Sequence, residues 1–529
     1  MLFLKSVMAT AAVVALLHAA APVQAAGLPS SNTAWVAAAT DAEIDRAFAR
    51  ARAEKKPLLL YWGATWCPPC NQLKATLFNR QDFAVLARSF VAVSVDGDRP
   101  GAQKLGQRFK VSGYPTTVLF SGAGQEITRL PGEVDAPQAL AVLQLGLAGG
   151  RPIKAVLADA LGGKALAATE WRLLAFYSWE TDEGQIVAKA EVPGTLVRLA
   201  AASGQAGTAA EPEITTRLWL KALAASDEGK GVKADTALRE RLMRVLADPT
   251  QARMHMDVLV AGAADIVRNF EASDPEMGAA PSRAPLLAAY DGALQRLQAD
   301  ATLSRADRLG ALTARVDLAR LDVPKSTVQL KLPEPLLKDL REFVARADSE
   351  ITDGYERQAV ITEASYTLGR AGLWPQSEAL LMANLAKSNA PYYLMSQLAG
   401  NARKLGRNDD ALRWYAQAYA KSEGPATRLQ WGGSYLSALV ELAPQDAAAI
   451  EKTAAQLLSE AGRDRSAFEG RSARSLRRAG AQLLSWNKAG QHAAALRRLQ
   501  TQLDGVCAKV VGAPEARRAC TAVLKPKAA

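Results

Sequence analysis

The sequence contains few of the residues that bind metals or transfer protons near neutral pH. Its 529 residues include only four cysteines and three histidines. A structural zinc site usually needs four Cys or His ligands close together, and here Cys67 and Cys70 are separated from the other two cysteines by about 440 residues. Half of a zinc site remains an alternative for this pair, but we predict no metal and no cofactor.

Beyond its first residues the sequence also lacks a long hydrophobic run of the length that a membrane-spanning helix requires. At the start, Lys5 precedes the apolar core Val7–Leu17, and Val23–Ala25 supplies small residues for cleavage. This pattern is typical of a secretory signal peptide. We therefore predict a signal peptide over residues 1–25, a mature chain without a membrane span, and export to an oxidising compartment, the periplasm of a Gram-negative cell. A retained N-terminal anchor is the alternative.

The charge is not concentrated in one place. The chain has 64 basic and 53 acidic residues, a net charge of +11. Nucleic-acid binding would favour basic residues clustered on one surface with aromatic residues between them. Basic stretches such as Arg471–Arg478 instead have the spacing of a solvated helix face, and we predict no nucleic-acid partner.

One short stretch carries the chemistry. Residues 57–62 form an apolar, aromatic-rich run that predicts a buried strand. Gly63 interrupts this run, and Trp-Cys-Pro-Pro-Cys follows at 66–70, leading into a helical pattern. A strand, a turn, a CxxC pair and a helix form the arrangement that thiol–disulfide chemistry needs.

The chemistry follows from where the two cysteines lie. The thiolate attacks a disulfide, and a free cysteine with a pKa near 8.5 is mostly protonated at pH 7. Cys67 is expected at the start of a helix, where unpaired N–H groups and the helix dipole favour an anion. Cys70 lies one turn further on. We therefore predict that Cys67 attacks and that Cys70 resolves the mixed disulfide. An inert structural disulfide is the alternative.

With its surrounding motifs, the chain resembles the thioredoxin-like family, and most closely the C-terminal domain of thiol–disulfide interchange proteins. The resemblance covers residues 41–146, about a fifth of the chain. It implies an α/β thioredoxin fold with a redox disulfide between Cys67 and Cys70. The motifs that carry it are, in order, Lys56-Pro57, Trp66–Cys70, Phe90–Asp96, Phe109–Thr116 and Val118–Phe120.

The resemblance also assigns substrate-binding residues. It implies that Pro115 is cis and lies against the CxxC pair, and that the backbone of Tyr114 pairs with an extended client segment as an added strand. Trp66 and Tyr114 would then form an apolar rim around Cys67. The alternatives are a strand-entry proline and aromatic residues that only pack in the core.

The chain departs from typical thioredoxins at two places. These proteins carry a buried aspartate six residues before the first cysteine and a lysine that faces it, whereas Tyr61 and Ala92 occupy those places here. No general base for Cys70 can be assigned from the sequence. Water or a nearby carboxylate such as Glu126 remains open.

The rest of the chain predicts a different architecture. Residues 147–152 read as a linker, as do residues 26–40 before the α/β region, and residues 153–529 repeat apolar residues at helical spacing. Glycines at 372 and 406 and prolines at 391 and 425 recur at 34 residues. This spacing resembles a tetratricopeptide repeat and predicts an all-α solenoid, with a non-repeating helical bundle as the alternative. A short alternating piece at 326–332 is the one strand-like exception.

Two features of the helical region bear on function. Aromatic residues are candidates for a concave binding surface, although helical spacing also suits core packing: Tyr392, Tyr393, Trp414, Trp431 and Tyr435. Cys507 and Cys520 are predicted to form a structural disulfide, which would contribute roughly 3 kcal/mol for a loop of this size. A second redox pair is the alternative.

Together these observations predict an exported thiol–disulfide oxidoreductase of the protein-disulfide reductase type. Its partners would be disulfide-bearing client proteins, bound or selected by the helical region, and a membrane thiol reductant that regenerates the dithiol. One alternative is an interaction scaffold whose thioredoxin-like part only docks partners. The other is a disulfide isomerase.

Overall fold

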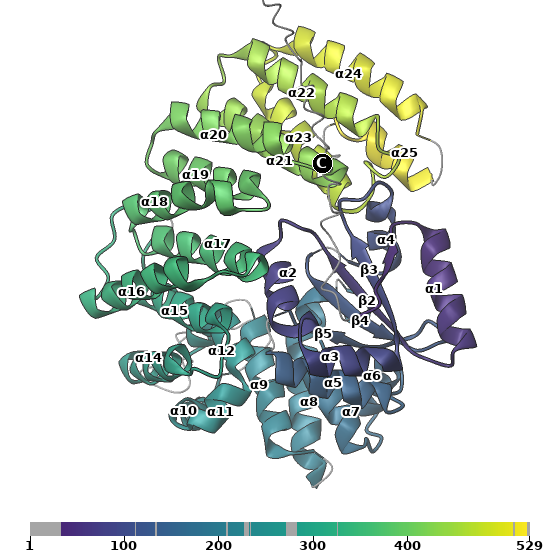
Figure 1. Cartoon of the computed structure of the whole chain (residues 1–529), viewed down its shortest axis with the longest axis vertical. Coiled ribbons are helices and arrows are strands. Elements are labelled where there is room, and N and C mark those ends of the chain that lie inside the picture. The colour runs from purple at the N-terminus through teal and green to yellow at the C-terminus, as the bar shows by residue number, and fades with distance from the viewer. Residues whose placement is uncertain are drawn as a thin grey trace, which may run out of the picture.

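The computed structural model describes residues 33–529 except 112, 133–134, 183, 208–209, 227–231, 233, 271–282, 325, 511–513 and 526–529. The predicted signal peptide, residues 1–25, lies outside the described residues. The described chain has two parts, an α/β region followed by a long helical region (Figure 1).

A five-stranded mixed sheet forms the centre of the α/β region, in the order β1-β3-β2-β4-β5. The first three strands in this order are parallel, and β4 and β5 are antiparallel to their neighbours. The central strand β2 is buried along its whole length, as its continuous apolar run predicts. The strands are β1 (Val36–Ala38), β2 (Leu58–Gly63), β3 (Val91–Asp96), β4 (Thr116–Phe120) and β5 (Glu126–Leu130).

Helices cover both faces of this sheet. One face packs against α1 and α4 through side chains such as Phe48 and Leu105, and the other packs against α2, η1 and α5 through side chains such as Leu77 and Leu143. The elements are α1 (Asp41–Ala53), α2 (Pro68–Leu73), the π-helical η1 (Lys74–Phe78), α3 (Gln81–Leu86), η2 (Ala87–Ser89), α4 (Ala102–Arg108) and α5 (Ala136–Leu147). This is the thioredoxin fold that the motif series predicted.

Three details differ from the sequence predictions. Residues 36–38, predicted as part of a linker, form the edge strand β1, which is too short to show an alternating pattern. Residues 118–120, predicted as an edge-side strand, belong to β4, which lies between β2 and β5. The alternating piece at 326–332 forms no strand in its described residues, since no neighbouring strand is present there to pair with it.

Everything from Ile153 onward is helical, as predicted. The helices form an arc that starts beneath the sheet with α6–α9, passes beside α2 with α17, and ends above α4 with α21–α25 (Figure 1). The first half comprises α6 (Ile153–Leu161), α7 (Ala168–Phe176), η3 (Trp179–Thr181), η4 (Lys189–Glu191), α8 (Val192–Gln205), α9 (Pro212–Ala225), α10 (Thr236–Ala247), α11 (Pro249–Met254), α12 (Met256–Ala261), α13 (Ala263–Arg268), α14 (Arg283–Ala299) and α15 (Arg305–Ala319). The second half comprises α16 (Glu334–Glu350), α17 (Gly354–Arg370), α18 (Trp374–Asn384), η6 (Leu385–Lys387), α19 (Pro391–Lys404), α20 (Asn408–Lys421), α21 (Pro425–Leu442), α22 (Ala447–Ala461), α23 (Gly470–Trp486), α24 (Ala493–Ala508) and α25 (Pro514–Thr521).

The residues that recur at 34 positions mark helix ends. Gly372 and Gly406 follow α17 and α19 with φ angles of 80° and 74°, the left-handed conformation that glycine adopts most easily after a helix. Pro391 and Pro425 are the first residues of α19 and α21, where a missing N–H costs no helical hydrogen bond. The recurrence thus has a physical basis, while membership of the tetratricopeptide class remains a prediction.

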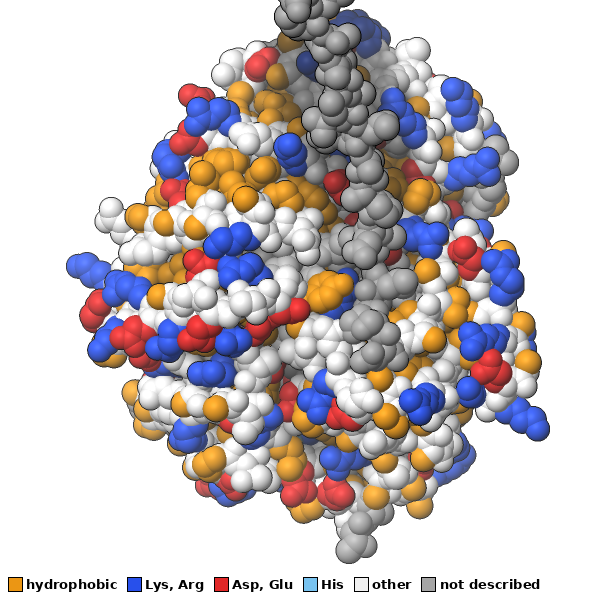
Figure 2. Space-filling view, viewed as in Figure 1, with side chains coloured by type: hydrophobic (Ala, Val, Ile, Leu, Met, Phe, Trp, Pro, Cys, Tyr) orange, Lys and Arg blue, Asp and Glu red, His pale blue; other side chains and the backbone are white. Residues whose placement is uncertain are grey.

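Two further features concern the outside of the chain. Among the described residues, no helix combines the length and the apolar character needed to cross a membrane. On the visible face, apolar side chains gather over the helices at the level of α19–α21, whereas charged side chains of both signs are spread over the rest (Figure 2). Near the C-terminus, a disulfide between Cys507 and Cys520 joins α24 to α25.

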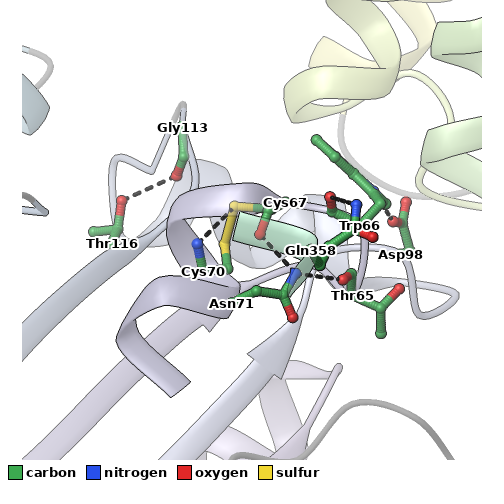
Figure 3. The surroundings of a disulfide bond; sticks show 9 residues. All are labelled: Thr65, Trp66, Cys67, Cys70, Asn71, Asp98, Gly113, Thr116 and Gln358. Carbon is green, nitrogen blue, oxygen red and sulfur yellow. Dashed lines mark hydrogen bonds between the residues drawn. A yellow bond between two sulfur atoms is a disulfide. The ribbon is translucent and has the colours of Figure 1, made fainter. Parts of the chain in front are cut away.

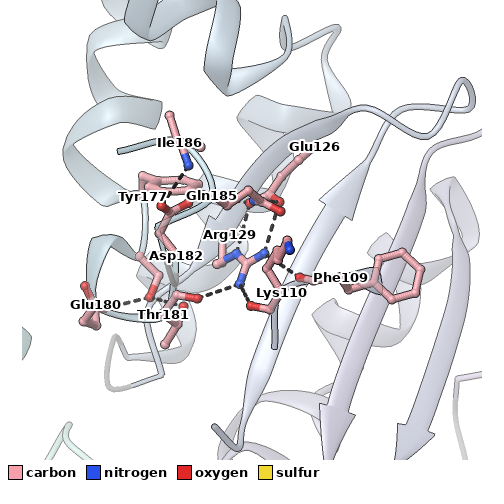
Figure 4. Close-up of polar contacts among 11 residues, drawn as sticks. Phe109, Lys110, Glu126, Arg129, Tyr177, Glu180, Thr181, Asp182, Gln185 and Ile186 are labelled. Carbon is pink, nitrogen blue, oxygen red and sulfur yellow. Dashed lines mark hydrogen bonds and ion pairs between the residues drawn. The ribbon is translucent and has the colours of Figure 1, made fainter. Parts of the chain in front are cut away.

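A buried polar cluster joins the sheet to the first helices of the arc (Figure 4). The Arg129 guanidinium on β5 donates to the carboxylate of Glu126 (Nε to Oε1, 3.0 Å) and to the backbone carbonyl of Thr181 (2.7 Å). Glu126 also accepts from the Tyr177 hydroxyl (3.0 Å) and the Gln185 amide (2.7 Å). The two parts of the chain are therefore fixed together by hydrogen bonds as well as by apolar packing.

Replacing Arg129 by methionine should lower the free energy of unfolding by about 3–5 kcal/mol, because the Glu126 carboxylate would remain buried without its cation. Arg151→Met is the matched control: this exposed arginine pairs with Asp159 and Glu170, and its loss should cost no more than about 1 kcal/mol. Chemical denaturation of both variants tests this. Equal losses would contradict the role given to the cluster.

Candidate functional site

The two cysteines of the CxxC motif lie at the start of α2 and form a disulfide (Figure 3). Their Cα atoms are 5.2 Å apart. Cys67 is the N-cap residue, and its sulfur accepts a hydrogen bond from the backbone N–H of Cys70 at 3.2 Å. This N–H would also favour a thiolate on Cys67 once the disulfide is reduced. Cys70 is fully buried, as expected for a resolving cysteine.

The turn before α2 is held by a residue that the sequence analysis did not single out. The buried Asn71 side chain donates to the backbone carbonyls of Thr65 (2.8 Å) and Cys67 (2.9 Å). These two bonds fix the loop that carries Trp66 and Cys67 against the first turn of the helix (Figure 3). A polar residue next to a CxxC motif gives no sequence signal that separates this role from simple exposure on a helix face.

The Tyr114–Pro115 peptide bond is cis, and this turn lies beside the active-site helix. The Trp66 and Tyr114 rings meet edge to face with their centroids 6.1 Å apart. Pro115 lines a small apolar pocket together with Leu73 and Leu77 from the active-site helix and its continuation. Gly113, immediately before the turn, is exposed. The predicted rim residues and the cis-proline turn are thus brought together around the cysteine pair.

The rim itself is covered by the helical region. The Trp66 ring stacks on Tyr393 of α19 (5.7 Å between centroids) and packs against Trp431 of α21 (5.3 Å). The Arg471 guanidinium lies 4.4 Å from the centre of the Trp66 ring, a cation–π contact. As a result, Trp66 is only 7% exposed and Cys67 only 2% exposed.

One carboxylate connects the rim to its cover. Asp98 follows β3 and accepts from the indole N–H of Trp66 (2.8 Å) and from both the backbone N–H (2.9 Å) and the hydroxyl (2.6 Å) of Thr427 on α21. Burial raises the pKa of Asp98, while these hydrogen bonds and the charge of Arg471 oppose that rise. Asp98 therefore positions the Trp66 ring and the end of α21 at the same time.

The active-site helix makes further contacts with α15 and α17. The Gln72 amide donates to Asp307 (3.0 Å), the Lys74 ammonium lies 5.2 Å from the centre of the Tyr355 ring, and the Gln358 amide lies 3.5 Å from the carbonyl oxygen of Trp66. The cover is thus continuous from the rim to the end of α2.

Comparison with known proteins places the α/β region. A family model for a thioredoxin-like domain matches residues 44–146. A thioredoxin-like protein of Synechocystis is 32% identical over 90 residues, which are 17% of this chain and 81% of that protein. The chain belongs to the thioredoxin-like family.

Other matches concern the same domain. The thiol:disulfide interchange proteins DsbD 2 and DsbD 1 of Pseudomonas aeruginosa are each 32% identical, over 23% and 21% of this chain and 22% and 20% of their own lengths. The chain thus spans about a fifth of these curated relatives. A solution structure of a thioredoxin from Thermus thermophilus is 28% identical over 22% of this chain and 86% of that protein, with a TM-score of 0.19.

The predicted aromatic surface has a different role from the one expected. Tyr392 and Trp431 are buried, and Tyr393 and Trp431 pack against Trp66 of the thioredoxin-like domain. Trp414 and Tyr435 are partly buried against the apolar cores of the helical region. Three of the five aromatic residues therefore form the cover and its support, and the other two pack within the array.

Ionisable groups also lie beneath the active-site helix. Burial and the neighbouring Asp98 raise the pKa of Asp96, at the end of β3, to about 6. Burial lowers the pKa of Lys74, and the nearby Asp96 opposes that shift. Glu126, the carboxylate considered in the sequence analysis, is instead engaged by Arg129, Tyr177 and Gln185. Among the described residues, no group of three or more His, Cys, Asp or Glu side chains could hold a metal ion.

Removing the Trp431 side chain should expose the disulfide. Trp431→Ala removes its contact with Trp66 and loosens Tyr393, and aromatic pairs are worth roughly 0.5–1.5 kcal/mol each. Reduction of Cys67–Cys70 by a small dithiol should therefore become about tenfold faster. Trp486→Ala, which removes a tryptophan stacked on His492, is the control and should leave the rate unchanged. An unchanged rate in Trp431→Ala would contradict the account of the cover.

The pKa of Asp96 predicts a pH-dependent stability. Since the carboxyl has a pKa of about 6 in the folded protein and about 3.9 when unfolded, the folded state binds more protons between these values, and this group makes stability fall as pH rises from 4 to 6. Asp96→Asn removes this penalty. The variant should be more stable than the wild type by about 3 kcal/mol above pH 6.5 and show no gain at pH 4. Denaturation at several pH values tests this, and a gain that is constant with pH would contradict it.

Proposed function

We propose that this chain is an exported thiol–disulfide oxidoreductase that reduces disulfides of client proteins. The observation that carries the proposal is the Cys67–Cys70 disulfide at the start of α2, beside the cis Tyr114–Pro115 turn. The similarity to thiol:disulfide interchange proteins supports the same chemistry. The signal-peptide pattern at the N-terminus supports export and a periplasmic location.

In the proposed reaction the dithiol form acts first. The Cys67 thiolate attacks a client disulfide, forms a Cys67–client mixed disulfide and releases one client thiolate, which takes a proton from water. Cys70, deprotonated, then attacks Cys67 Sγ, the mixed disulfide breaks, and the second client thiolate leaves. Two electrons pass to the client and the Cys67–Cys70 disulfide is formed. A membrane thiol reductant would restore the dithiol.

The direction of transfer is part of the proposal. Cys67-Pro68-Pro69-Cys70 contains no histidine or other cation between the cysteines that would stabilise the Cys67 thiolate. Without that stabilisation the reduced form is less favoured, and the pair acts as a reductant rather than as a strong oxidant. Equilibration with a glutathione buffer measures this directly.

The helical region is proposed to select the clients. It encloses the Trp66 rim through Tyr393, Trp431 and Arg471, so a client must displace or fit this cover before Cys67 can react. The exposed Gly113 next to the Tyr114–Pro115 turn offers the backbone edge to which an extended client segment would add. Selection by a cover would restrict the enzyme to few clients.

The same enclosure favours one second candidate. A chain whose Cys67 is 2% exposed could be an interaction scaffold in which the thioredoxin-like domain only holds the helical arc in place. The disulfide isomerase remains the further alternative, but no described feature favours it.

Trapping separates these functions. Cys70→Ser removes the resolving thiol, so Cys67 should hold clients as mixed disulfides that a reducing agent releases, at a yield many times that of the wild type. Cys67→Ser, which keeps Cys70 and differs in one atom at the matched position, should hold none. Recovery of adducts from both exported variants on non-reducing gels tests this. If Cys70→Ser traps nothing, the scaffold becomes the better account.

A further inference from the structure

The position of the resolving cysteine contains a polar group without a partner. The Tyr61 side chain lies in the interior, 2% exposed, and its hydroxyl has no hydrogen-bond partner. Its ring is held edge to face by Phe78 (4.9 Å between centroids) and Trp35 (5.9 Å). Packing alone would be served equally well by phenylalanine, and a buried hydroxyl without a partner is costly.

Gly63 shows where this hydroxyl points. A Cβ atom at position 63 would lie 2.4 Å from the Tyr61 hydroxyl oxygen and 3.3 Å from Cys70 Sγ. Both atoms therefore border the same point on the sheet, on the face that the active-site helix covers. Any side chain at position 63 would come between them, which gives a reason for glycine at the end of β2.

We propose that the Tyr61 hydroxyl donates a hydrogen bond to Cys70 Sγ when the disulfide is reduced, and is a catalytic residue for the resolving step. This inference rests on the proposed function. In the disulfide, Cys70 Sγ is a weak acceptor, and the hydroxyl has no partner. When Cys70 loses its proton to water, the thiolate becomes a strong acceptor. The phenol keeps its own proton throughout, and the thiolate then attacks Cys67 Sγ as described above.

The charges around Tyr61 suit donation rather than proton transfer. Burial, the Asp96 carboxylate on β3 and Tyr355 on α17 all raise the pKa of Tyr61, so the phenol stays protonated. Lys74, one turn after Cys70, is buried and acts electrostatically on Asp96. Tyr61 stands where typical thioredoxins carry a carboxylate that accepts the proton. Here the thiolate is stabilised by a donor, and no base at that position is required.

The test uses Tyr61→Phe, which removes only the hydroxyl. In a Cys67→Ser background, the ultraviolet absorbance of the thiolate gives the pKa of Cys70, with Cys67→Ser/Cys70→Ser as the blank. We expect Tyr61→Phe to raise this pKa by about one unit, a tenfold change in acid dissociation. With Cys67 present, resolution of a preformed mixed disulfide with glutathione should slow about tenfold, while the first attack by Cys67 keeps its rate.

The control is Tyr290→Phe, which removes a buried hydroxyl that donates to the carbonyl of Leu259 in the helical region; both quantities should stay at their wild-type values. Wild-type resolution in Tyr61→Phe would overturn the inference and leave the proposed function standing. Failure of the wild-type protein to form any mixed disulfide would overturn the proposed function itself. If Tyr61→Phe does not fold, infrared difference spectra of the wild type decide: reduction must shift a tyrosine C–O band, and an unchanged band would overturn the inference.

Discussion

The Asp98 carboxylate holds together the two halves of the candidate site. It accepts from Trp66, the residue before the first cysteine, and from Thr427, at the start of α21. These residues are more than 300 positions apart in the chain, so the carboxylate is a link between the thioredoxin-like domain and the far end of the helical arc. Because a partly buried carboxylate is costly unless its oxygens are hydrogen-bonded, both partners must stay in place together.

This link explains why the site is closed. With Trp66 fixed by Asp98, its ring presents one surface to Tyr393 and Trp431, and Arg471 lies over it. A thioredoxin-like domain alone would expose this rim to any disulfide. Here the same apolar surface is used twice, once for packing and, in the proposed function, for client recognition. Access to Cys67 is then set by the free energy that opens the cover, and a client that offers replacement contacts lowers it.

Local sequence carried most of the domain and little of its setting. The run before Gly63, the CxxC pair and the Tyr-Pro turn each have a physical signature, and they allowed the thioredoxin fold to be predicted. Strand β1 was missed because three residues cannot show a period. The aromatic cover was missed because the contact of Trp66 with Trp431 depends on the curvature of the whole arc, to which many small helix-packing angles contribute. No local pattern encodes that sum.

The site shows the same division. The replacement of a carboxylate by Tyr61 could be seen in the sequence, but its meaning depends on Gly63 bringing the hydroxyl near Cys70 Sγ, which only coordinates reveal. Asn71 and Asp98 were not singled out, since a single polar residue near a turn has the same sequence signature whether it is solvated or buried. Helical content after Ile153 followed from periodicity, whereas the direction of the arc around the sheet did not.

The most direct test of the central claim is the redox state of Cys67 and Cys70 in living cells, measured by acid quenching followed by thiol alkylation. A reductase supplied with electrons predicts a pair that is mainly reduced although its compartment is oxidising, while Cys507 and Cys520 in the same molecules remain oxidised and serve as an internal reference. A Cys67–Cys70 pair as fully oxidised as the Cys507–Cys520 pair would contradict the account.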